Sequence, residues 1–80
     1  MDTILEKLDK LQSIIERLHK LGYTTLEKDE IYIQLFDSKQ GYFHVGRRFQ
    51  PFGDLGQLDR LVSAELKAYQ DINRVVELQR

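Results

Sequence analysis

The strongest pattern in the sequence is the alternation of side chains between Ile31 and Phe49. Residues 31–36 and, with one exception, 42–49 place an apolar side chain at every second position, and β-branched and aromatic residues are frequent in both runs. A period of two with such residues is typical of β-strands. The segment 37–41 between the runs contains Asp, Ser and Gly, which are typical of turns. The pattern therefore predicts a β-hairpin, one face of which the rest of the chain must bury.

The alternation also assigns the two faces of the hairpin, because neighbouring side chains in a strand point to opposite sides. The face that should pack against the rest of the chain carries Ile31, Ile33, Leu35, Phe43, Val45 and Phe49. The other face should be open, and it carries Tyr32, Gln34, Phe36, Tyr42, His44 and, with an uninterrupted strand, Arg48. Gly46 interrupts the second strand, and a bulge there would change the direction of Arg47 and the residues after it. The sequence leaves the direction of Arg47 open.

Residues 3–21 predict an amphipathic helix in front of the hairpin. Thr3 and Glu6 fit a capping box, and Gly22 suits the left-handed position that ends a helix. A wide apolar stripe recurs at spacings of three and four residues, at Ile4, Leu8, Leu11, Ile15 and Leu18. The stripe covers fewer than three heptads, so packing on the sheet is favoured over a coiled coil.

A second helix should follow the hairpin. Residues 50–53 are expected to break the strand, since they contain proline and glycine. Asp54 is the expected N-cap, with the residue three positions on as its capping partner. The helix should then run from Leu55 or Leu58 to about Leu78. It carries two neighbouring apolar stripes, of which one can lie on the sheet and the other can meet the first helix or another chain.

These elements predict a two-layer α+β sandwich. Residues 23–26, Tyr-Thr-Thr-Leu, favour a further strand but could also be a loop. The expected order is therefore an N-terminal helix, an antiparallel hairpin or three-stranded meander, and a C-terminal helix, which is αββα or αβββα. Eighty residues correspond to a single small domain, residues 1–80.

Composition narrows the function classes. The chain has no cysteine, which excludes disulfides and thiolate metal sites. Twelve basic and thirteen acidic residues give a net charge of −1, and no block of like charge favours a polyanion or an anionic membrane. No apolar run is long enough to span a bilayer, and the N-terminus lacks the apolar core of a signal peptide. A cytoplasmic location is expected by default.

The open face is the best candidate for a binding site. The residues expected to bind there are Tyr32, Phe36, Tyr42, His44, Arg47 and Arg48. The rings would be desolvated anchors, and the arginines would supply directional polar contacts. We interpret the chain as a small protein-binding or regulatory module that presents this face to a partner or to a second copy, as in a homodimer. Nucleic-acid binding through the same face is the alternative, against which stands the small supply of cations. A plain structural role is also open, because aromatic residues fit pleated surfaces.

Arg47 and Arg48 lie close in sequence to residues 53–56, which suggests an anion site at the start of the second helix. The pattern lacks the glycine spacing and the lysine of a P-loop. The simpler interpretation is that the arginines form ion pairs with nearby carboxylates, those of Asp37, Asp54 or Asp59.

No set of residues suggests an enzyme. The chain has two histidines, His19 and His44, and its serines lack a nucleophile motif such as Gly-x-Ser-x-Gly. The acidic run at residues 27–30 does not match a calcium-binding loop. We therefore expect no catalytic residues, no cofactor and no metal.

Overall fold

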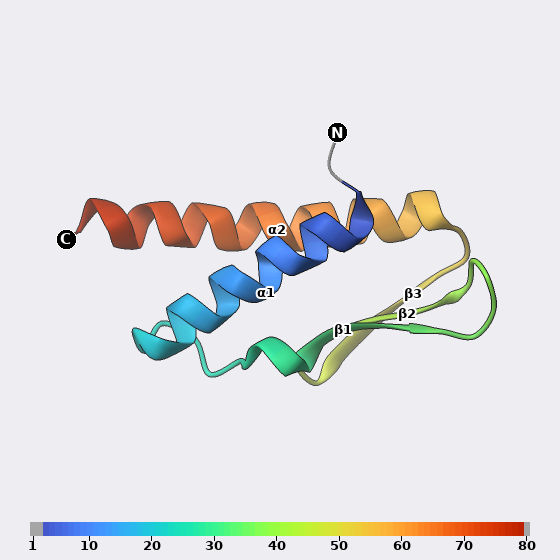
Figure 1. Cartoon of the computed structure of the whole chain (residues 1–80), viewed down its shortest axis with the longest axis horizontal. Helices are drawn as coiled ribbons and strands as arrows, with labels where there is room; N and C mark the ends of the chain where they lie inside the picture. The colour runs from blue at the N-terminus through green and yellow to red at the C-terminus, as the bar shows by residue number, and fades with distance from the viewer. Residues whose placement is uncertain (1–2, 80) are drawn as a thin grey trace.

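The computed structural model describes residues 3–79 and has the order helix, three strands, helix (Figure 1). Its elements are α1 (Ile4–Lys20), a short 3-10 helix η1 (Lys28–Glu30), β1 (Ile31–Leu35), β2 (Gly41–Val45), β3 (Arg48–Phe52) and α2 (Leu55–Leu78). The strands form one antiparallel sheet in the order β1-β2-β3. The predicted α+β fold is confirmed in its αβββα form.

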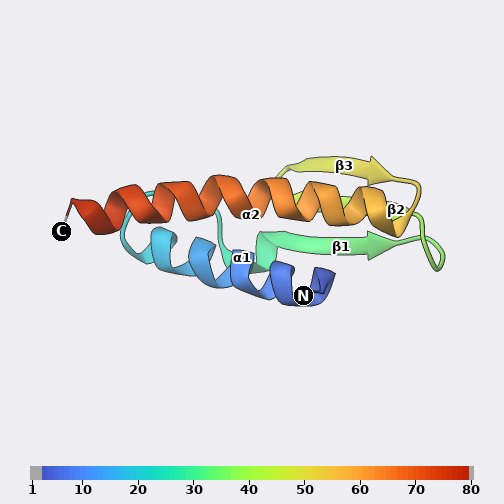
Figure 2. The ribbon, with the colours of Figure 1, turned by 90° about the horizontal axis from the view of Figure 1, so that it is seen from above.

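Both helices lie on the same side of the sheet (Figures 1 and 2). Two ion pairs join them near opposite ends of α1, with 2.8 Å between Lys7 Nζ and Asp59 Oδ1 and 2.6 Å between Arg17 Nη1 and Glu77 Oε1. The other side of the sheet has no element of residues 3–79 over it. Within the same residues, no helix is long and apolar enough to cross a membrane.

The helices are capped by the residues that the sequence predicts. The hydroxyl of Thr3 accepts a backbone N–H of the first turn of α1 at 3.1 Å. At the other end, the N–H of Tyr23 donates to the C=O of Leu18, and Gly22 has a φ of 84°. This is the pattern of a Schellman cap. Asp54 accepts a backbone N–H three residues on, at 2.8 Å, and so caps α2.

The expected long second strand is in fact two strands, joined by a two-residue turn that begins at Gly46. Val45 pairs with Arg48 across this turn, and Gly46 has a φ of 63°, as in a type II′ turn. A Cβ on Gly46 would lie 2.6 Å from the side chain of Leu26. A single strand running to Phe49, with or without a bulge at Gly46, is therefore wrong, because the glycine is a turn residue.

The turn inverts the side of the sheet that each residue of β3 faces. Phe49, which was predicted to be buried, lies on the open side of the sheet and is 57% exposed, and Phe52 is buried in its stead. Pro51 lies inside β3 and does not break it, because a residue at the edge of a sheet can lack an N–H without losing a ladder bond. The inward position of Phe49 and the strand break at residues 50–53 are both corrected.

Residues 23–26 do not form a strand. The N–H of Leu26 donates to the hydroxyl of Thr24 at 3.2 Å, and the C=O of Thr24 lies 3.2 Å from Nδ1 of His19. These local hydrogen bonds use backbone groups that a strand would offer to a neighbour. The segment instead packs Leu26 against the core and over Gly46. Of the two alternatives left open for this segment, the strand is wrong and the loop is found, and the third strand of the meander is β3.

An apolar cluster fills the space between the sheet and the helices. Its buried members are Ile31, Phe43, Val45 and Phe52 from the sheet and Leu11, Ile15, Leu58, Val62 and Leu66 from the helices. Phe43 is 1% exposed and occupies the middle of the central strand. Of the other residues predicted to face the helices, Ile33 is half-buried, but Leu35 is 56% exposed at the end of the edge strand β1. The helices cover the sheet less completely at this edge than the sequence pattern predicts.

Candidate functional site

The open face of the sheet carries five rings in contact, which we call the aromatic cluster: Tyr32, Phe36, Tyr42, His44 and Phe49. The rings of Tyr32 and His44 are stacked, with centroids 4.3 Å apart and planes 10° apart. Tyr42 is edge-on to Phe36 at 4.9 Å and to Phe49 at 5.0 Å. Such ring pairs each contribute about 0.5–1.5 kcal/mol beyond their burial. The rings therefore hold one another in a defined arrangement.

The register of the sheet brings these rings together from separate strands. Tyr32 pairs with His44, and His44 pairs with Phe49, so that one ring from each strand forms a row. Tyr42 lies in the next row, opposite Pro51. The sequence predicts the other four rings on this face and misses Phe49. The missed signal is the Gly-Arg pair between two alternating runs, which is typical of a two-residue hairpin turn.

The cluster is exposed at its rim. Tyr32, Phe36 and Phe49 are 45%, 58% and 57% exposed, and the other two rings are half-buried. Nε2 of His44 lies 2.8 Å from Oε1 of Gln34, so that the ring N–H donates to the amide oxygen. The imidazole thus has a polar partner within the face, and the exposed surface around it is largely apolar.

The open face is also uncharged. Its strand positions, residues 32, 34, 42, 44, 49 and 51, contain no Asp, Glu, Lys or Arg. Arg48 was predicted here, but it pairs with Val45 on the helix side, and its Nη2 lies 3.3 Å from Oε1 of Glu65 in α2. That placement of Arg48 is wrong because the turn shifts the phase of β3. Arg47 is exposed within the turn between β2 and β3.

The anion site considered at the start of α2 does not assemble. Oδ1 of Asp54 accepts the N–H of Gln57 at 2.8 Å, and Oε1 of Gln57 accepts the N–H of Gly53 at 3.0 Å. The N–H of Gln57, in the first turn of the helix, therefore has a partner, and the next N–H, that of Leu58, donates to the C=O of Asp54. Arg48 pairs with Glu65 and with none of the three aspartates proposed from the sequence. Asp59 instead pairs with a lysine of α1.

Asp37 orders the loop beside the aromatic cluster. Its Oδ1 accepts the N–H of Lys39 at 2.8 Å and the N–H of Gln40 at 2.9 Å. These two bonds, first that of Lys39 and then that of Gln40, hold the pKa of the Asp37 carboxyl below its ordinary value. The ionised carboxylate therefore stabilises the folded loop.

Asp37→Ala should lower the melting temperature at neutral pH, and this difference should shrink in acid. The pKa of the folded carboxyl is lower than that of the unfolded one. Its contribution is therefore complete above the unfolded pKa and is lost as the pH falls through the folded pKa. Thermal melts of both chains between about pH 7 and about pH 2 test this. An equal difference at both ends would show that the charge of Asp37 has no part in the stabilisation.

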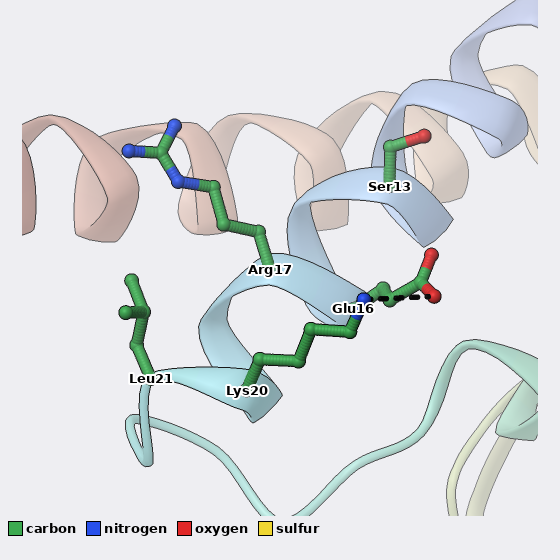
Figure 3. Close-up of a pocket in the computed structure, with 5 residues that line it drawn as sticks. All are labelled: Ser13, Glu16, Arg17, Lys20 and Leu21. Carbon is green, nitrogen blue, oxygen red and sulfur yellow. Dashed lines mark ion pairs between the residues drawn. The ribbon is translucent and has the colours of Figure 1, made fainter.

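A shallow hollow of about 360 Å³ lies on α1 (Figure 3), and it is lined by Ser13, Glu16, Arg17, Lys20 and Leu21. Its charges are used in ion pairs, with 3.7 Å between Lys20 Nζ and Glu16 Oε1, and with Arg17 bound to Glu77 of α2. The hydroxyl of Ser13 also lines the hollow, but no hydrogen bond joins it to the carboxylate of Glu16 as a nucleophile is joined to its base. Among residues 3–79, no three His, Asp or Glu side chains gather to hold a metal ion.

A second cavity, which we call the edge groove, is apolar and has a volume of about 470 Å³. It lies between the start of α1, the free edge of β1 and the start of α2, and Leu5, Leu8, Ile33, Leu35 and Leu55 are among the side chains that line it. No sequence pattern indicated it, because its walls come from three segments that are distant in the chain.

No protein-family model matches the chain, and no match was found among curated proteins or among solved structures. The fold and the site together define a small αβββα protein with helices on one side of the sheet and an uncharged aromatic cluster on the other.

Proposed function

We propose that the protein is a small protein-binding module whose open sheet face binds another protein. The observation that carries the proposal is the aromatic cluster, in which rings from all three strands contact one another and remain exposed at the rim. Tyrosine and phenylalanine are enriched in the cores of protein interfaces. Rings that already order one another lose little conformational freedom when a partner covers them.

The size of the cluster supports this role. A buried aromatic side chain accounts for roughly 200 Å², so that the three rim rings, each about half exposed, offer about 300 Å². The largest apolar patch on a monomer is about 300–600 Å² and is often functional. The aromatic cluster alone therefore reaches the size of a functional patch.

The charge of the open face favours a protein over a nucleic acid. Proteins that bind single strands combine stacking rings with a cationic groove, and phosphate contacts supply most of their non-specific affinity. Here the strand positions of the open face carry no cation, and the guanidinium of Arg48 is turned toward Glu65. Nucleic-acid binding is therefore the less favoured alternative, which the experiment below distinguishes from protein binding.

Phe49→Ala should weaken binding of the protein partner by at least about tenfold, as expected for an interface anchor. Phe49 is exposed on an edge strand, so its removal should leave the fold intact. The partner is isolated with the wild-type chain as bait and identified. Its affinity for each variant is then measured by titration calorimetry.

The matched control is Val75→Ala, which removes a side chain of similar exposure, 53%, from the part of α2 that extends past the sheet (Figure 1). It should leave the affinity unchanged. If Phe49→Ala leaves the affinity of the partner unchanged and Val75→Ala weakens it, the interface lies on the helices instead. A parallel anisotropy titration measures binding of a labelled oligothymidine. If this binding is tight and is weakened both by salt and by Phe49→Ala, the open face binds nucleic acid rather than a protein.

A further inference from the structure

The free edge of β1 presents unused hydrogen-bonding groups. At the two ends of β1, the C=O of Glu30 accepts an N–H from the β2 side, and the N–H of Phe36 donates to a C=O on that side. Alternate residues of an antiparallel strand bond to the same neighbour, so Ile33 and Leu35 direct their N–H and C=O groups to the free edge. These groups have no hydrogen-bond partner within residues 3–79.

The opposite edge, at β3, is protected. Because the even-numbered residues of β2 bond to β1, its odd-numbered residues bond to β3, and residues 49 and 51 point their backbone groups outward. Pro51 has no N–H to offer there. Edge strands often use proline or charge to prevent pairing with another chain. β1, with the sequence Ile-Tyr-Ile-Gln-Leu, contains neither.

The space beside β1 can also accommodate an added strand. Figure 2 shows α1 displaced to the side of β1 that faces away from β2, and Figure 1 shows the first half of α1 above the level of the sheet, toward which its second half descends. A strand added to β1 would therefore lie below the first half of α1. The edge groove opens here, and two of its lining side chains, Leu5 and Leu35, are 73% and 56% exposed. An added strand would cover both.

We propose that β1 of a second copy fills this place, antiparallel to β1 of the first, so that two chains form one continuous sheet of six strands. The pair is related by a two-fold axis at Gln34. In this register, Ile33 of each copy exchanges its N–H and C=O with Leu35 of the other. The pairing uses the two residues whose edge groups are free. It leaves undisturbed the C=O of Ile31, which already accepts from Nε2 of Gln12 at 2.8 Å.

Side chains favour a second copy as the occupant. Across the axis, Tyr32 faces Phe36 of the second copy on the open side, and aromatic cross-strand pairs are favourable. The residues of β1 are uncharged, so no like charges meet along the paired strands. Beyond the strand ends, Asp29 lies toward the turn that carries Lys39 of the second copy. A register centred on Ile33 instead would set Asp29 toward Asp37, which is less favourable.

This pairing goes beyond the proposed function and does not depend on it. It uses the edge of the sheet rather than its face, and it joins two aromatic clusters side by side on one surface. Loss of partner binding with an intact dimer would count against the proposed function alone. A monomer that still binds its partner through Phe49 would count against the pairing alone.

The test is the solution mass together with amide hydrogen exchange of the full chain. Light-scattering chromatography over a concentration series should give twice the 9.5 kDa of one chain. The amides of Ile33 and Leu35 should exchange about 100-fold more slowly in the dimer than in a monomeric variant. Leu35→Pro removes an outward N–H from an edge strand, a position where proline is tolerated, and should give a folded monomer. Leu5→Lys, which charges the exposed wall of the edge groove without touching the sheet, should do the same.

Phe49→Ala is the control, because it alters the open face at the far edge and should remain dimeric. A wild-type chain that stays monomeric, with Ile33 and Leu35 amides exchanging as fast as exposed ones, would overturn the pairing. So would a dimer that survives both Leu35→Pro and Leu5→Lys, or one that only Phe49→Ala disrupts. That last result would place the dimer contact on the open face.

Discussion

Replacing Phe43 by alanine should lower the free energy of unfolding by about 3–5 kcal/mol. Phe43 is 1% exposed and lies at the centre of β2, between β1 and β3, in the apolar cluster to which both helices contribute. Its removal leaves a cavity that the sheet cannot close, because neighbouring strands fix its position. A domain of this length is stabilised by only about 5–10 kcal/mol in total. The variant should therefore lose a large part of its stability.

Urea denaturation followed by circular dichroism measures this loss. Phe49→Ala provides the matched control, since it makes the same chemical change on the next strand at a side chain that is 57% exposed. It should cost about 1–2 kcal/mol, because an exposed ring loses only its contacts with Tyr42 and His44, and so clearly less than Phe43→Ala. Equal losses in the two variants would contradict the assignment of Phe43 to the core and Phe49 to the open face.

This contrast between two phenylalanines marks where sequence reasoning succeeds and where it fails. The alternation in β1 and β2 correctly places Phe43 inside and Tyr32, Tyr42 and His44 outside, because period-two patterns are local. Phe49 was placed inside by extending that period through Gly46. One turn residue reverses the chain and inverts the phase of every later position.

The same inversion explains the error over Arg48. Its predicted place on the open face depended on counting from Val45, and the turn sets it opposite Val45 instead, where it reaches Glu65. The helix caps, by contrast, were predictable because Thr3 and Asp54 act on their own first turns. Local signals determine where elements begin and end, but a short turn decides how their faces combine.

The free edge and the edge groove lay outside the reach of the sequence for a different reason. Their walls come from α1, β1 and α2, and their shape depends on how far α1 is displaced from the sheet. Periodicity shows that Leu5 and Leu35 are apolar, but it does not show that both remain exposed on the same side of the molecule. Only the three-dimensional structure shows that β1 and β3 are the two edges of the sheet, and that Pro51 protects the β3 edge while the β1 edge is free.

Gly41→Ala should be the second strongly destabilising change, by roughly 1–3 kcal/mol, as found when atoms are forced into a packed site. A Cβ on Gly41 would lie within 2 Å of the backbone oxygen of Gln34 on the neighbouring strand. Because that atom is backbone, a side-chain rotation cannot relieve the overlap. β1 and β2 would have to separate where they meet the loop.

Gly53→Ala is the matched control for this change, because a Cβ there would meet its nearest neighbour, the flexible side chain of Gln57, at an ordinary 3.9 Å. Urea denaturation should show a much smaller loss for Gly53→Ala. Amide chemical shifts in Gly41→Ala should change most at Leu35 and Phe36, the two residues that follow Gln34 in the chain. The same displacement would disturb both the edge proposed to pair and the Phe36 end of the aromatic cluster, so Gly41 positions the two surfaces together. Equal losses in the two variants would show that the strands do not approach as closely as the structure has them.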